Sequence, residues 1–190
     1  MKKSSSIIKS VIALSGVAVA CVAILSIANT FLQLSPEEAE ERRIAFLHSI
    51  ILAESFVVLH DLDNEEKSAV LKDFNGRYSE YIMRVYAAKG GANDGIYIIE
   101  SKAAGYNGFL TVMVVYNSDG TVRLVSIKES PPQEFISKIS FEMLNLLLRG
   151  RSGNVGGVQD FDAAGSGATK TLSGVVAAVN LANRFYEKHL

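Results

Sequence analysis

The sequence has no tryptophan, one cysteine, three prolines and three histidines among its 190 residues. The single Cys21 cannot form an internal disulfide, and so few cysteine and histidine residues show none of the spacings that bind zinc or an iron–sulfur cluster. The scarcity of proline and the lack of tryptophan argue against a disordered proline-rich chain and against an aromatic-rich binder of single strands. We therefore assign no metal site, and any redox chemistry of this chain requires an organic cofactor.

The formal net charge of −1 is the sum of two unlike regions. Lys2, Lys3 and Lys9 precede the first acidic residue, Glu37, so all 20 acidic residues lie after Pro36. This acidic balance argues against a nucleic-acid binder, which normally clusters Lys and Arg on one face. The length suits one domain of ordinary size and excludes two large ones.

An uncharged run of 27 residues extends from Ser10 to Pro36, and its centre is almost wholly apolar. About 20 such residues cross a bilayer as a helix, and the lysines before the run place the amino terminus in the cytoplasm. We predict a cytoplasmic segment at residues 1–9, a transmembrane helix at residues 10–34 and an extracytoplasmic domain at residues 35–190.

Three other interpretations of the apolar run remain, of which a buried core helix suits the flanking lysines and the length least. A cleaved signal peptide would use the Ala-Val-Ala of residues 18–20, but the run continues beyond the usual apolar core of about 7–15 residues. A lipoprotein would carry its lipid on Cys21, but the residues that follow this cysteine are apolar. The single span, with Cys21 as a small apolar residue, is the interpretation that we prefer.

Helical patterns stand on both sides of a block of strands. Ser35, Pro36 and Glu38 have the pattern of a helix start with a capping box. Segments rich in Tyr, Ile and Val predict the strands, and the turn Asn117–Gly120 gives the clearest hairpin signal. The expected helices cover residues 36–59, 65–74, a segment after Pro132 that ends at Gly150, and 172–189; the expected strands cover residues 77–87, 95–102, 109–116 and 121–128. Because helices and antiparallel strands come in blocks, we expect an α+β fold, with an antiparallel sheet flanked by helices.

Six of the 15 glycines lie between Gly150 and Gly167, directly before the last predicted helix. This concentration marks a loop whose backbone approaches another group closely. Small residues, free amides, Lys170 and hydroxyl groups at a helix start suit a phosphate, because N–H groups and the helix dipole favour an anion. The segment is not a P-loop, since it lacks that motif's Gly-Lys-Ser/Thr ending. The alternative is a flexible loop in which Thr171 is an ordinary N-cap.

The motif Ser166-Gly-Ala-Thr-Lys-Thr171, followed by Ser173-Gly-Val-Val, resembles the covalent-flavin motif of a known family. That family contains the FMN-binding subunit of the Rnf electron-transport complex and its relative in the sodium-pumping NADH:quinone reductase. Further matching motifs, in the family's order, are Gly105-Tyr-Asn-Gly108, Glu129-Ser-Pro131, and Gly156-Gly157 with Asp160-Phe-Asp162. With the single amino-terminal span, the resemblance extends over essentially the whole chain.

The resemblance implies that a flavin transferase, using FAD and a divalent cation, esterifies Thr169 with the phosphate of FMN. The cofactor-binding residues that it carries over are Thr169, then Ser166, Gly167, Ala168, Lys170 and Thr171 near the phosphate, and Glu129, Ser130 and Tyr106 near the flavin ring. It assigns no catalytic residue and no metal ligand.

The resemblance also implies an electron-transfer subunit of a membrane-bound, ion-translocating ferredoxin–NAD oxidoreductase in a bacterial or archaeal cytoplasmic membrane. The subunit would be non-catalytic alone and would work with other membrane and iron–sulfur subunits, since the sequence lacks cluster cysteines and a nicotinamide motif. Its brief loops favour the Rnf-type subunit. The alternative is an anchored extracytoplasmic binding or sensory module whose glycine-rich loop holds a phosphate ligand non-covalently.

Two departures from the family pattern are present. Gly165 is inserted, so Asp162 precedes Ser166 by four positions rather than three. Lys128 replaces the histidine that precedes the family's Glu-Thr-Pro, and Pro132-Gln-Glu-Phe135 replaces its glycine-rich continuation. We expect the wall of the flavin pocket to differ there in shape or charge.

Overall fold

The computed structural model describes residues 15, 19, 21–23, 36–129, 139–156 and 168–190. The chain divides into two compact units, Met1–Ile50 and Ile51–Leu190. Most of the transmembrane helix predicted at residues 10–34 lies outside the described residues. Among those that are described, no helix combines the length and the apolar character that a membrane span requires.

The first unit contains helix α2 (Pro36–Ile50), which begins where the Ser-Pro pattern predicts. The prediction that this helix continues to Leu59 is wrong, because the helix ends at Ile50 and Ser55–Asp61 form strand β1 in the second unit. The strand contains Val57 and Val58, whose branched side chains favour extended backbone. Pairing of β1 with a neighbouring strand overrides the helical spacing that the sequence also shows.

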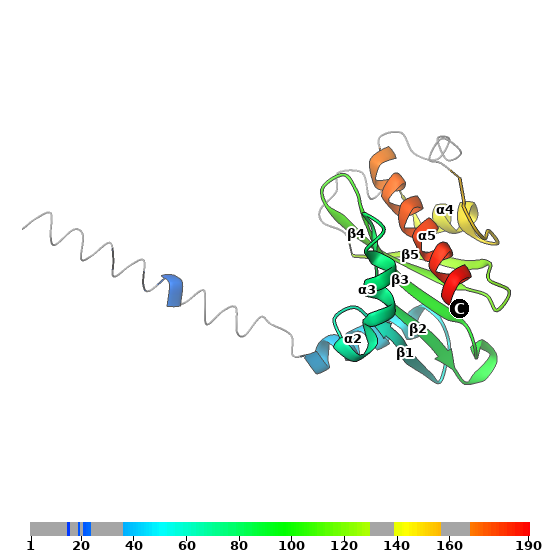
Figure 1. Ribbon diagram of the computed structural model, residues 1–190, viewed down its shortest axis with the longest axis horizontal. Coiled ribbons are helices and arrows are strands. Elements are labelled where there is room, and N and C mark those ends of the chain that lie inside the picture. The colour runs from blue at the N-terminus through cyan, green and yellow to red at the C-terminus, as the bar shows by residue number, and fades with distance from the viewer. Residues whose placement is uncertain (1–14, 16–18, 20, 24–35, 130–138, 157–167) are drawn as a thin grey trace, which may run out of the picture. The chain divides into compact units, whose positions relative to one another are not determined.

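The second unit is built on a five-stranded antiparallel sheet with the order β1-β2-β3-β4-β5, which confirms the expected antiparallel sheet flanked by helices (Figure 1). The remaining strands are β2 (Tyr81–Lys89), β3 (Tyr97–Ala104), β4 (Phe109–Tyr116) and β5 (Val122–Glu129). β4 has the predicted bounds, whereas β2, β3 and β5 begin later than predicted.

The β4–β5 hairpin is closed by the turn that the sequence predicts. The amide of Gly120 donates to the carbonyl oxygen of Asn117 over 3.0 Å, and Gly120 has a φ of +79°. Asp119 accepts from the Thr121 amide over 2.9 Å, which stabilises the turn from its side chain.

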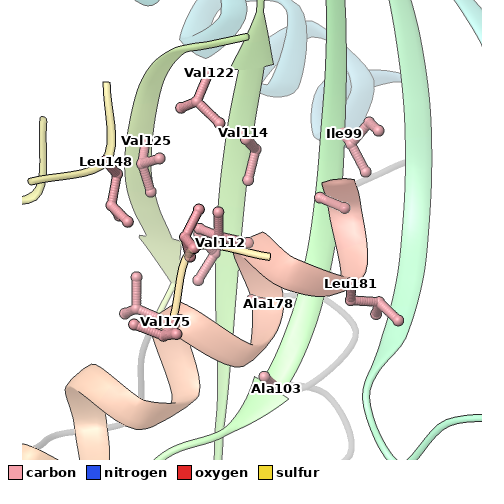
Figure 2. Packing of buried hydrophobic residues seen from close by; sticks show 14 of the residues in the cluster. Ile99, Ala103, Val112, Val114, Val122, Val125, Leu148, Val175, Ala178 and Leu181 are labelled. Atoms are coloured by element: carbon pink, nitrogen blue, oxygen red, sulfur yellow. The ribbon is translucent and has the colours of Figure 1, made fainter. Parts of the chain in front are cut away.

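Three helices cover one face of the sheet: α3 (Ala69–Asn75), α4 (Phe141–Leu148) and α5 (Thr169–His189) (Figure 1). α5 packs against β3 and β4, and α4 packs against β5. Figure 2 shows this layer, in which Val112 of β4 lies close to Val175 and Ala178 of α5. The long last helix is therefore held on the middle of the sheet by apolar contacts.

Two predicted helices differ in their bounds from those observed. The segment predicted as one helix at residues 65–74 is a 3-10 turn, η1 (Glu65–Lys67), followed by α3, and Asn64 caps the turn by accepting from the Glu66 amide over 3.0 Å. α4 begins at Phe141, because Ser140 accepts from the Met143 amide over 3.1 Å and acts as its N-cap. Residues 130–138, where that helix was expected to start, lie outside the described residues.

Two histidines meet where the end of α5 packs against β1 and α3. The ring of His60 lies 6.0 Å from that of Phe185, and the ring of His189 lies 4.8 Å from Phe185 and 5.7 Å from Phe74. Burial lowers the pKa of His60 below its usual 6.5, and the neighbouring His189 lowers it further, although the Lys67 backbone raises it. Burial and then the charge of Lys188 lower the pKa of His189, which Asp73 raises in part.

The free energy of unfolding is expected to fall as the pH drops below about 6.5. The unfolded chain binds protons at the ordinary pKa, whereas the folded chain resists them, so protonation favours unfolding until the pH is below the folded values. Urea unfolding of the full chain at about pH 7.5 and about pH 5.5 measures the slope. A His60→Gln, His189→Gln double variant should show a smaller slope; an unchanged slope contradicts this origin. His48→Gln, outside the cluster, is the control.

Candidate functional site

The last helix begins at Thr169, one turn before the predicted start at Leu172. Extending the helix backwards keeps its buried face continuous, because Thr171, Leu172 and Val175 share that face at helical spacing and are all buried. The side chains of Thr169 and Lys170 are exposed in this first turn. Thr171 is 2% exposed, so it belongs to the core and is not the N-cap.

Ala168 occupies the N-cap position of α5. Its methyl group has no atom that accepts a hydrogen bond from the first-turn amides, whereas Ser, Thr, Asp and Asn at this position do. The Ser173 hydroxyl donates to the Thr169 carbonyl oxygen over 2.8 Å, within the first turns of the helix. The start of α5 thus presents backbone donors, an exposed threonine and an exposed lysine in one turn.

The turn between β3 and β4 contacts the start of α5, because Lys170 of the helix lies over the ring of Tyr106 in the turn. Gly105–Gly108 form the turn, in which the Gly105 amide donates to the Gly108 carbonyl oxygen over 2.7 Å. Tyr106, at its tip, is 53% exposed, and the Lys170 ammonium lies 5.5 Å from the centre of its ring. The structure therefore brings together three of the residues expected around the flavin: Thr169, Lys170 and Tyr106.

Hydrogen bonds from the sheet fix α5 along its axis. The Ser101 hydroxyl donates to the Ala178 carbonyl oxygen over 3.1 Å, and the buried Tyr116 hydroxyl donates to Asn183 Oδ1 over 2.7 Å. Both contacts come from the strands that the turn of Tyr106 joins. The helix start and the turn are consequently positioned by the same two strands.

Gly174 allows the closest approach between α5 and the sheet. A Cβ atom at this position would lie 2.5 Å from the Ala104 carbonyl oxygen and 3.2 Å from Leu110 Cδ1. The carbonyl oxygen belongs to the backbone and cannot move aside as a flexible side chain can. The glycine of the Ser173-Gly-Val-Val motif is therefore required for packing one turn after Thr169.

A Gly174→Val variant is expected to be less stable by about 1–3 kcal/mol, because the helix must move away from β3 to admit the side chain. Urea unfolding of the full chain measures this difference. The matched control is Ser173→Val, which places the same side chain at the neighbouring exposed position and should change the stability by about 0.5 kcal/mol or less. Equal effects of the two variants would contradict a packing role for Gly174.

For the other residues expected near the flavin ring or its phosphate, the structure describes less. Glu129 ends β5, where its backbone pairs with Thr111 of β4. Ser130, Ser166 and Gly167 lie outside the described residues, as do the Asp162–Gly165 departure and Pro132–Phe135.

A buried ion pair beside Glu129 was not foreseen from the sequence. The β4–β5 register passes from Thr111↔Glu129 to Val112↔Ile127, so Lys128 forms a bulge. The Lys128 ammonium lies 3.1 Å from Glu100 Oε1, and the Tyr86 hydroxyl donates to Glu100 Oε2 over 3.4 Å. Bulges commonly redirect side chains beside functional sites. The available signal was the acidic Glu100 directly after two isoleucines of β3. Only 3% of Glu100 is exposed.

A second buried cation lies next to this pair. Arg84, the cross-strand partner of Glu100, is 7% exposed, and its guanidinium pairs with Asp61 over 3.0 Å and with Asp63. Burial lowers the pKa of Arg84, but the charges of Asp61 and Glu100 outweigh it and leave this pKa raised. Arg84 and Lys128 are thus each paired with carboxylates.

Two cavities of the described part of the chain lie away from the start of α5. One of about 600 Å³ is lined by α2 residues, Glu40, Glu41, Ile44, Ala45 and His48. The other, of about 330 Å³, lies towards the carboxyl end of α5, lined in part by Asp119, Ser152 and Glu187. Thr169, at the start of that helix, is not among its lining residues. No cluster of three or more potential metal ligands occurs among the described residues.

Comparison with protein families finds that part of this chain is similar to an FMN-binding domain. Residues 105–183 match the family model of that domain, less than half of the chain. The match begins at the Tyr106 turn and includes the start of α5. It is consistent with an FMN-binding subunit family and supports a flavin-binding role in electron transfer. No curated protein matches the chain.

The described residues fit the phosphate end of FMN. The start of α5, where Ala168 gives no side-chain cap, has backbone donors and the positive end of a helix dipole, both of which favour a phosphate. Lys170 supplies a cation in the same turn, and Gly174 keeps the helix start against the sheet. Thr169 adds an exposed side chain with a hydroxyl group in the same turn.

Proposed function

We propose that this chain carries FMN as a phosphoester of Thr169 and transfers electrons as a subunit of a membrane-bound, ion-translocating ferredoxin–NAD oxidoreductase of the Rnf type. The observation that carries the proposal is the exposed Thr169 at the uncapped start of α5, within the residues that match an FMN-binding domain. The motif resemblance adds the covalent bond and the type of complex.

Attachment requires an accessible hydroxyl group on the chain and an external transferase. The Thr169 oxygen forms a bond to the FMN-side phosphorus of FAD, the pyrophosphate P–O bond breaks, AMP leaves with the bonding electrons, and the hydroxyl proton passes to solvent. The exposure of Thr169 permits a second protein to reach it.

After attachment, the chain's own groups stabilise the phosphodiester and orient its substituent. The first-turn amides and the dipole of α5 favour its negative charge, and the Lys170 ammonium offsets it. FMN supplies the one- and two-electron redox chemistry. Tyr106, held by Lys170, would lie at the ring side of the site, with Glu129 and Ser130.

The membrane assignment forms part of the proposal. The uncharged run at residues 10–34, preceded by lysines, supports a single span with the amino terminus in the cytoplasm and the FMN domain on the other side. The electron donor and acceptor would be other membrane and iron–sulfur subunits of the complex, with lipid around the span.

A denaturing gel tests the covalent flavin directly. The full chain, coexpressed with a flavin transferase, should give a fluorescent band under ultraviolet light and a mass greater by FMN less one water. The chain expressed without the transferase should give neither. A chain that keeps its unmodified mass in both cases contradicts the proposal, and a flavin or phosphate ligand that is released on denaturation favours the non-covalent binding module instead.

A further inference from the structure

A row of paired residues crosses the sheet near the Tyr106 turn. Tyr81 of β2 pairs with Lys102 of β3, which pairs with Thr111 of β4. Directly paired residues of antiparallel strands share a face of the sheet. Their neighbours Ala103 and Leu110 belong to the core under the helices, so Tyr81, Lys102 and Thr111 face away from α5. The backbone of Glu129 ends the same row on β5.

Two aromatic rings lie beside this row: Tyr81, which belongs to it, and Phe109, two residues before Thr111 on β4. Phe109 pairs with Ala104 on the same face, and its ring centre lies 5.8 Å from that of Tyr81. Phe109 is 49% exposed and Tyr81 is half-buried. Phe109 follows Tyr106 by three residues and starts the strand that leaves its turn. An exposed ring pair therefore lies next to the turn that Lys170 contacts.

The attachment point suits an occupant tethered to α5. Lys170, which directly follows Thr169, contacts Tyr106 at the turn, so a group bound to Thr169 starts beside the same turn from which Phe109 emerges. A planar apolar ring system stacks well on aromatic side chains. A protein partner would need a far larger contact than two rings offer. The row's Lys102 adds a cation for the polar edge of such a ring system.

We propose that the isoalloxazine ring of the flavin stacks on Phe109, against which the Tyr81 ring packs edge-on at an interplanar angle of 61°, while the flavin phosphate is held at Thr169. This inference rests on the proposed function and deepens it, because it assigns the ring to the exposed Phe109 at the edge of the sheet face opposite α5. Phe109 lies within the residues that match the FMN-binding domain, whereas Tyr81 lies outside them.

Time-resolved fluorescence anisotropy of the flavin-loaded full chain tests the stacking surface. In the unmodified chain the ring should rotate with the protein. Phe109→Leu and Tyr81→Leu should each add a fast rotation, with the ratio of detached to stacked ring raised about fivefold or more. Tyr81→Phe keeps the ring face and should restore the slow rotation, which separates stacking from a folding defect. Phe141→Leu is the matched control, because Phe141 is 51% exposed on α4.

The outcomes separate this inference from the proposed function. A flavin that remains on the chain in a denaturing gel, with slow rotation unchanged in both leucine variants, overturns the stacking surface alone. The same result is expected if the two rings dock a protein partner instead. A fast component of equal size in Phe141→Leu, or in Tyr81→Phe, also overturns it. A chain without attached flavin overturns the proposed function and this inference together.

Discussion

A Thr169→Ala variant coexpressed with a flavin transferase is expected to lose all flavin fluorescence on a denaturing gel. Alanine removes the hydroxyl oxygen that forms the phosphoester, and no other group is proposed to replace it. The fold should be retained, because Thr169 is an exposed first-turn residue and alanine is a strong helix former. Intact mass measurement should give the unmodified chain.

Neighbouring hydroxyl groups provide the control for this variant. Ser173 is exposed one turn further along α5, and its hydroxyl bonds to the Thr169 carbonyl oxygen. Ser173→Ala should therefore retain the fluorescent band and the added mass. Fluorescence that persists in Thr169→Ala and disappears in Ser173→Ala would assign the attachment site to Ser173. Fluorescence that persists in both variants would exclude each of these residues as the single attachment site.

The second large effect is expected at the buried ion pair of the sheet. Glu100→Ala should lower the free energy of unfolding by about 3–5 kcal/mol, because it leaves the Lys128 ammonium without its carboxylate in a site where that side chain is only 14% exposed. It also removes the acceptor of the Tyr86 hydroxyl. Urea unfolding of the full chain measures the loss.

Two further variants test the explanation of this loss. Glu100→Leu combined with Lys128→Met removes both charges and should recover most of the stability, since replacing a whole buried pair by apolar residues is often neutral. Arg77→Ala removes an exposed pair with Asp73, whose atoms are 3.8 Å apart, and should cost about 1 kcal/mol or less. Equal losses in Arg77→Ala and Glu100→Ala would show that burial is not the cause.

Local signals were sufficient where a short stretch of chain decides its own conformation. The Asn117–Gly120 turn was predicted because a positive φ at Gly120 and a side-chain bond from Asp119 act within a few residues. The start of α2 and the bounds of β4 were predicted for similar reasons. The prediction that the segment before α5 binds a phosphate also depends on neighbouring residue types, and it stays a prediction.

Predictions failed where distant residues compete for the same segment. Residues 51–59 have helical spacing, but pairing with β2 makes Ser55–Asp61 a strand. The start of α5 moved to Thr169 because Thr171 fills the core under the sheet, which a one-dimensional pattern does not show. Glu100 and Lys128 are 28 residues apart, and only the strand register and the bulge bring their charges together.

The sequence alone determined the class of fold, the uncharged amino-terminal run and the threonine that the flavin motif singles out, because each depends on the order of neighbouring residues. The tertiary structure decided that Thr169 is exposed in the first turn of α5, that Lys170 meets Tyr106, and that Gly174 lies against Ala104. It also decided that the rings of Tyr81 and Phe109 meet edge to face. These contacts depend on the packing of α5 and on strand register, which join residues far apart in the chain.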